Sequence, residues 1–221
     1  MSFLNQLKQQ AQSLQTRQGD ELQQLDTHTA ATEAACKMVW HYFMELPRQL
    51  NVIEPAAASL SLDGKTPWPP MKQTDFRFDA RKKTLRGQEV FEYLALGWQL
   101  EPQQPAVAGA NGQPKGRVSV NFPPDLERVE RRLRAGQVRH ERQELRHPET
   151  NRLQSIVFLH DMAARASVRV TPNHEKGSFD VRLAAVGGLE IASTQYSIAQ
   201  LNSSALDELA KLIVGQPSRF L

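Results

Sequence analysis

The sequence predicts an α+β fold with a long N-terminal helix, a mainly antiparallel sheet of about seven to eight strands, and two shorter helices. Three observations lead to this prediction. The first fifty residues are rich in Gln, Leu, Ala and Glu and have no proline before Pro47. Most segments of the second half alternate apolar and polar residues, as strands do. Two short stretches, at about 124–135 and 203–215, have apolar residues at helical spacing.

The predicted N-terminal helix has an apolar seam that recurs every three or four residues, the spacing at which helices pack together. The pattern changes register near Gly19, which leaves two structures open. Either one helix continues through an inserted spacing of four residues, or a helix ends at Gly19 and Asp20 caps a second one. The seam consists of Leu4, Leu7, Leu14, Leu22, Leu25, Val39, Phe43 and Leu46, with Ala11, Thr29, Thr32 and Cys36 in the same register.

The chain is expected to divide into a helical arm, residues 1–50, and an α+β body, residues 51–221. A helix of about 45 residues would span roughly 65 to 70 Å at 1.5 Å per residue, more than one face of such a body requires. Within the body, residues 101–116 have three prolines and three glycines. This composition predicts a flexible loop or a seam between two halves of the body.

The strands of the body are predicted from period-two patterns. Residues 75–78 and 89–100 are expected to form a hairpin around the connection DARKKTLRG. One interpretation of the charged run 137–152 is the outer strand of a long hairpin that turns at HPETN, with both faces polar. After Gln137 the pattern indicates an antiparallel meander, and the last helix begins near Ser203 or Ser204.

Arginine is concentrated in residues 125–152, which contain eight arginines and six carboxylates. A nucleic-acid-binding helix usually presents cations without interleaved acids, because nearby carboxylates oppose phosphate binding. Here Glu127 and Glu130 each precede an arginine by four residues, Arg131 and Arg134, the order that favours ion pairs on an exposed helix. We therefore interpret this surface as solvated and self-neutralising.

An anionic partner such as nucleic acid remains an alternative, through the basic segments 77–87 and 126–146. Aromatic residues near the first segment would suit single strands, whose bases stack on rings. The candidate anion contacts are Arg81, Lys82, Lys83, Arg86, Arg128, Arg131 and Arg132.

The overall composition narrows the functional classes. The chain has 221 residues, 27 Lys and Arg against 24 Asp and Glu, and a single cysteine, Cys36. One cysteine excludes an intramolecular disulfide. No signal peptide or run of eighteen apolar residues is present, so we expect a cytoplasmic protein with no membrane partner.

Motifs for catalysis or ligand binding are sparse. The sequence has no HExxH, GxSxG, GxGxxG or Walker phosphate loop. Its histidines are expected at surfaces and turns, and Cys36 is expected to be a small buried hydrophobe because it lies in the apolar register of the helix. We predict no catalytic residue, no metal ligand and no cofactor, and leave enzymatic activity as the less favoured class.

Three functional hypotheses follow. The first, favoured by the length and spacing of the arm, is a non-catalytic interaction or assembly module that self-associates through its N-terminal helix or binds another helical protein. The second is a nucleic-acid-binding protein that uses the basic segments. The third is a small-molecule or enzymatic pocket between the sheet and its helices, lined by His160, Asp161 and Tyr196.

Overall fold

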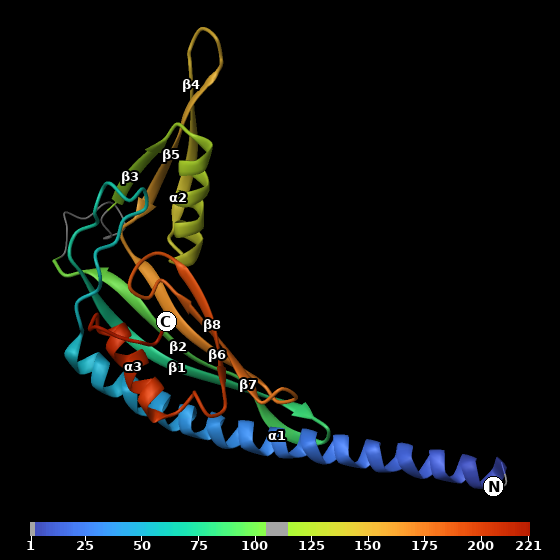
Figure 1. Ribbon diagram of the computed structural model, residues 1–221. Helices are drawn as coiled ribbons and strands as arrows, with labels where there is room; N and C mark the ends of the chain where they lie inside the picture. Colours follow the sequence, from blue (N-terminus) through green and yellow to red (C-terminus); the bar gives the residue numbers. More distant parts are fainter. Residues whose placement is uncertain (1–2, 105–114) are drawn as a thin grey trace.

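A computed structural model describes residues 3–104 and 115–221 of the protein, except for the side chains of Leu4 and Gln18 (Figure 1). It confirms the α+β prediction. Within the described residues there are three helices, α1 (Phe3–Ile53), α2 (Pro123–Ala135) and α3 (Ser203–Ile213). The strands described are β1 (Met71–Leu85), β2 (Gln88–Pro102), β3 (Lys115–Val120), β4 (His140–Arg146), β5 (Leu153–Asp161), β6 (Ala164–Asn173), β7 (Ser178–Ala184) and β8 (Ile191–Ser197).

Helix α1 is continuous over 51 residues and is not broken at Gly19. An interior glycine costs about 1 kcal/mol relative to alanine, which weakens a helix without ending it. The helix also passes through Pro47 and ends six residues later, at Ile53. At 1.5 Å per residue it is about 76 Å long. Among the described residues, no helix is both long and apolar enough to cross a membrane.

The larger sheet has the order β1-β2-β6-β7-β8, and every neighbouring pair is antiparallel. The β1–β2 hairpin is longer than predicted, because most of the connection DARKKTLRG belongs to β1. Its turn is only Arg86 and Gly87, which both have positive φ angles, 47° and 78°, as a two-residue turn of type I′ requires. This extension was not predicted because Arg81, Lys82 and Lys83 are consecutive charged residues and lack the apolar–polar alternation of a strand. All three are exposed.

The smaller sheet has the order β3-β5-β4, so the strands described form two sheets rather than the single sheet predicted. The predicted β4–β5 hairpin is present and turns at residues 147–152. Every residue of β4 is exposed, and the hairpin projects from the body in Figure 1. Helix α2 packs beside this sheet through Val129 and Leu133, and β5 leads directly into β6 of the larger sheet. The predicted loop or seam at 101–116 lies largely outside the described residues.

The C-terminal half of α1 is part of the hydrophobic core. Cys36, Val39 and Phe43 have no exposed surface, and Leu46 packs against the same cluster. The ring of Phe43 meets Phe78 of β1 edge to face at 6.3 Å. Helix α3 lies alongside this part of α1, as Figure 1 shows. This half of the predicted seam is therefore covered by the protein's own sheet and by α3.

Candidate functional site

The contact between α1 and the body begins near Leu25. Arg86, at the tip of the β1–β2 hairpin, donates hydrogen bonds to the carbonyl oxygen of Leu25 at 3.3 Å and to Thr29 Oγ1 at 2.6 Å. Its Nε also lies 3.7 Å from the Asp26 carboxylate. Thr29 is buried, and its hydroxyl also donates to the Leu25 carbonyl. This set of contacts fixes the point at which α1 leaves the body.

A second hairpin turn supports the same stretch of α1. The β6–β7 turn places the carbonyl oxygen of Glu175 3.0 Å from His28 Nδ1. Thr32, which is fully buried, hydrogen bonds the His28 carbonyl through its hydroxyl at 2.7 Å. Threonines in the apolar register of the helix therefore face the body here, where their hydroxyls are satisfied by the helix itself.

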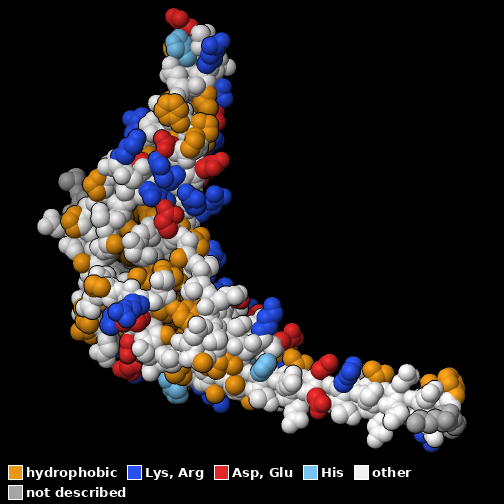
Figure 2. All heavy atoms as spheres, viewed as in Figure 1, with side chains coloured by type: hydrophobic (Ala, Val, Ile, Leu, Met, Phe, Trp, Pro, Cys, Tyr) orange, Lys and Arg blue, Asp and Glu red, His pale blue; other side chains and the backbone are white. Residues whose placement is uncertain are grey.

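Residues 3–24 of α1, called the overhang here, extend beyond these contacts. Every side chain described in this range is exposed, and at 1.5 Å per residue the overhang is about 33 Å long (Figure 1). Leu7, Leu14 and Leu22 are 45%, 57% and 55% exposed. Their spacing places them on one stripe of the helix, about 80° wide at about 100° per residue. Figure 2 shows hydrophobic side chains recurring along this projecting segment.

A compact cluster of three chemically different side chains, Glu33, Cys36 and His174, follows along α1 after the contacts of Arg86 and His28, on the side nearer the core. Glu33 Oε1 is 2.8 Å from His174 Nε2 and accepts a hydrogen bond from the backbone N–H of Phe91 at 2.9 Å. The ligand atoms of Glu33, Cys36 and His174 all lie within 4.8 Å of one another. The His174 side chain is 2% exposed, although the sequence predicted a surface or turn histidine. The turn is confirmed, but the side chain is buried beneath α1.

The protonation of Cys36 limits what this cluster can do by itself. Burial raises the pKa of the Cys36 thiol, and the nearby charge of Glu33 raises it further. A catalytic cysteine needs its thiolate form and access to a substrate, and Cys36 has neither. The expectation of a small buried side chain at this position is confirmed.

An open groove of about 760 Å³ lies beside the cluster, between α1 and the β1–β2 hairpin. Trp40 and Phe91 form its apolar part, and Lys37 and Lys82 contribute positive charge. Glu33 also lines the groove and is the member of the buried cluster that reaches it.

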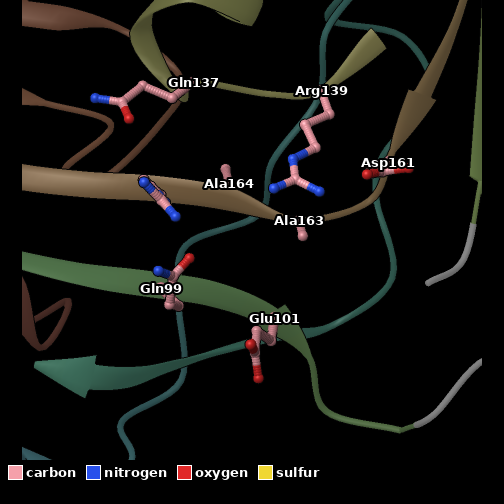
Figure 3. Close-up of a pocket in the computed structure, with 8 residues that line it drawn as sticks. Gln99, Glu101, Gln137, Arg139, Asp161, Ala163 and Ala164 are labelled. Atoms are coloured by element: carbon pink, nitrogen blue, oxygen red, sulfur yellow. The ribbon is translucent and has the colours of Figure 1, made fainter. Parts of the chain in front are cut away.

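A smaller polar pocket of about 200 Å³ lies where the two sheets meet (Figure 3). Its lining includes Asp161, one of the residues predicted for a small-molecule site, together with Arg139, Glu101 and Gln137. In Figure 3 these polar side chains come from different segments and do not point at one common centre. A catalytic site needs such convergence, so this pocket offers no arrangement for catalysis.

The other two residues predicted for that site serve packing roles. His160 is 3% exposed and stacks on Trp68, with ring centroids 5.4 Å apart. Burial lowers the pKa of His160, against the opposing effect of its contact with Asp161. The Tyr196 hydroxyl donates to the carbonyl oxygen of Phe220, and the two rings pack at 5.2 Å. The structure therefore does not gather His160, Asp161 and Tyr196 into one pocket.

No family model, curated protein or solved structure matches the chain. Function must be argued from the residues themselves. The arrangements that remain are the overhang, the buried cluster at its base, and the basic surfaces.

The basic residues of the β1–β2 hairpin contact acids of the same chain. Arg81 lies 3.0 Å from Glu92, and Lys82 lies 3.7 Å from Glu89. Lys82 also sits over the ring of Phe91, and Arg86 contacts α1 as described above. Within the described residues, Lys83 is the predicted contact of this hairpin for which no ion pair is found.

Three arginines of α2, Arg128, Arg131 and Arg132, are also paired, but not in the predicted way. Arg132 lies 2.9 Å from Glu190 and donates to backbone carbonyls of the 59–70 loop, and Arg131 lies 3.8 Å from Glu190. Arg128 pairs with Asp125. The expected pairs of Glu127 with Arg131 and of Glu130 with Arg134 are not found among the described residues. Arg131 is instead turned toward the segment before β8, a partner that no local sequence spacing could reveal.

Proposed function

We propose that the protein is a non-catalytic assembly module that self-associates through the overhang, residues 3–24 of α1. The observation that supports this proposal is the exposed stripe of Leu7, Leu14 and Leu22 on the overhang, which none of the described elements covers. An isolated helix of this length is marginally stable in water, because most helical stability comes from packing. Complete burial of each leucine would contribute roughly 1.5 to 3 kcal/mol.

The spacing of the stripe favours an antiparallel pair of two copies. Positions 7, 11, 18 and 22 are arranged symmetrically about a point between Leu14 and Gln15. Their spacing is therefore the same in both chain directions. The change of register near Gly19 produces this symmetry. Two antiparallel copies centred on that point would place Leu7 of each opposite Leu22 of the other, with Leu14 near the middle of the contact.

The charges of the overhang favour the same orientation. Lys8 lies in its first half, whereas Arg17, Asp20 and Glu21 lie in its second half. In the antiparallel alignment, Lys8 of one copy is level with Asp20 and Glu21 of the other. A parallel pair would bring the acidic positions level with each other, which opposes association because like charges repel.

The oligomeric state tests the proposal. We expect the full-length protein to be a dimer by mass measurement in solution, and Leu14→Glu to shift it to a monomer. Thr16→Glu is the matched control, because it adds the same charge at an exposed position on the opposite face of the helix. A wild-type protein that stays monomeric at high concentration, or a Leu14→Glu variant that stays dimeric, would contradict self-association through the overhang.

Cysteine cross-linking then tests the orientation. Leu7→Cys and Leu22→Cys are made separately and mixed before oxidation. An antiparallel pair forms disulfides only in the mixture, whereas a parallel pair forms them within each variant alone. Native Cys36 does not interfere because it is fully buried.

A further inference from the structure

Glu33, Cys36 and His174 bring three kinds of metal ligand together at one point. Glu33 and Cys36 are three residues apart on α1, so both point to the same side of the helix. His174 comes from the β6–β7 turn, which packs against that side. The three ligand atoms lie within 4.8 Å of one another. In a tetrahedral zinc site, bonds of about 2.0 to 2.3 Å place ligand atoms roughly 3.3 to 3.7 Å apart.

We propose that Glu33, Cys36 and His174 bind a transition-metal dication, with Zn²⁺ as the best fit. Thiolate and imidazole ligands select zinc over Mg²⁺ and Ca²⁺, which prefer oxygen ligands. To fit tetrahedral geometry, the Glu33–His174 contact at 2.8 Å would open by about half an ångström, and the other ligand-atom separations, which are within 4.8 Å, would close by up to about an ångström.

The surroundings of the cluster suit a bound ion. The backbone N–H of Phe91 holds the Glu33 carboxylate in place, as second-shell donors commonly do around metal sites. Glu33 also lines the groove beside α1, which gives an ion a path to the cluster. The fourth position of a tetrahedral ion would be open to water from this side.

Binding would convert the thiol of Cys36 to a thiolate. The metal–sulfur bond replaces the sulfur–hydrogen bond, and the proton leaves to solvent, with no change of oxidation state. Burial disfavours the bare thiolate, and a dication bonded to the sulfur supplies the missing counter-charge. Affinity should therefore weaken as the pH falls, because protons compete for the ligands.

A bound ion would join α1 to the β6–β7 turn at the base of the overhang. This inference does not depend on self-association, since the ligands all come from one chain. It would add coordination bonds to the contacts that Arg86 and His28 already make along the same stretch.

Metal titration of the full-length protein tests the site. With Co²⁺ as a spectroscopic probe, we expect one ion per chain and a sulfur-to-cobalt charge-transfer band in the near ultraviolet. Zn²⁺ should displace the cobalt and raise the unfolding temperature. Because the loss of a second-shell partner alone costs ~10- to 100-fold in affinity, Cys36→Ala and His174→Gln should each weaken binding by more than about 100-fold.

His41→Gln is the matched control, because His41 is an exposed histidine on α1 that lines the same groove. It should leave the affinity and the charge-transfer band unchanged. X-ray absorption of the zinc-loaded wild type should show one sulfur at about 2.3 Å among nitrogen and oxygen ligands, and this measurement needs no variant that might unfold. Absence of stoichiometric binding, or a zinc shell without sulfur, would overturn the proposal.

Discussion

Arg86 Nη2 donates a hydrogen bond to Thr29 Oγ1 at 2.6 Å, and so joins the tip of the β1–β2 hairpin to helix α1. Arg86 occupies the first turn position with a φ of 47°, where asparagine or glycine would be more favourable. An arginine here makes the turn less stable, but its long side chain reaches α1 at the point where the overhang begins. Its side chain is 29% exposed, so the contact is partly shielded from solvent.

Replacement of Arg86 should loosen this end of α1. Hydrogen bonds to charged groups contribute about 1.5 to 3 kcal/mol, and partial exposure reduces that, so Arg86→Ala should lower the free energy of unfolding by about 1 to 2 kcal/mol. Amide hydrogen exchange should rise between residues 25 and 32 before it rises in the core. Lys83→Ala, on the same hairpin, should change stability by less than about 0.5 kcal/mol. Equal effects of the two variants would contradict the anchoring role of Arg86.

Phe43 should be one of the most sensitive positions in α1. It is fully buried and packs on Phe78. Phe43→Ala should therefore destabilise the fold by about 3 to 5 kcal/mol, the usual effect of removing a buried aromatic ring. Met44, the next residue, is exposed, and Met44→Ala should cost less than about 1 kcal/mol in chemical denaturation. A mild effect at Phe43 would mean that α1 is not part of the core.

His160 should make stability depend on pH below about 6.5. Burial lowers the pKa of His160 in the folded protein, so the unfolded chain binds a proton more readily. The stability that the neutral ring provides is complete above the unfolded pKa of about 6.5 and is lost as the pH falls toward the folded pKa. Asp161, Asp63 and His140 act on the same ring, and the contacts with the two acids oppose the shift.

Denaturant midpoints measured between pH 5 and 7.5 test this expectation. The wild type should lose stability over the lower part of that range, and His160→Gln should remove most of the slope while also costing packing against Trp68. His41→Gln, an exposed histidine on α1, is the control that should leave the slope unchanged. A wild-type slope that survives in His160→Gln would assign it to another group.

The sequence predicted the elements of the fold better than their limits. Helices α2 and α3 and the β4–β5 hairpin were predictable because capping, turn and period-two signals are local. The continuity of α1 at Gly19 was left open, because a glycine is compatible with both a helix interior and a helix end. The division into two sheets was missed, because alternation along a strand does not identify the strand's neighbours.

The candidate site was less predictable, because its residues are distant in the sequence. Glu33 and His174 are separated by 141 positions and fit no ligand-spacing motif. Arg86 was named only as a candidate anion contact under the less favoured hypothesis, since a cluster of cations reveals no partner until the fold places Thr29 beside it. The exposed leucines of the overhang did follow from the 3.5-residue pattern, which also extends into the buried half of the same helix.

Helix α1 is continuous, and its contacts with the body begin near Leu25. A rotation of the helix at that point would therefore move the whole overhang. A tilt of about 5° at Leu25 would displace the tip of the overhang by about 3 Å over its length of about 33 Å. Small shifts of the sheet would therefore produce larger displacements at the N-terminal end of α1. Gly19 lies between the two and has the lowest helix propensity in the overhang. A partner that binds the overhang must accommodate this displacement or restrict it.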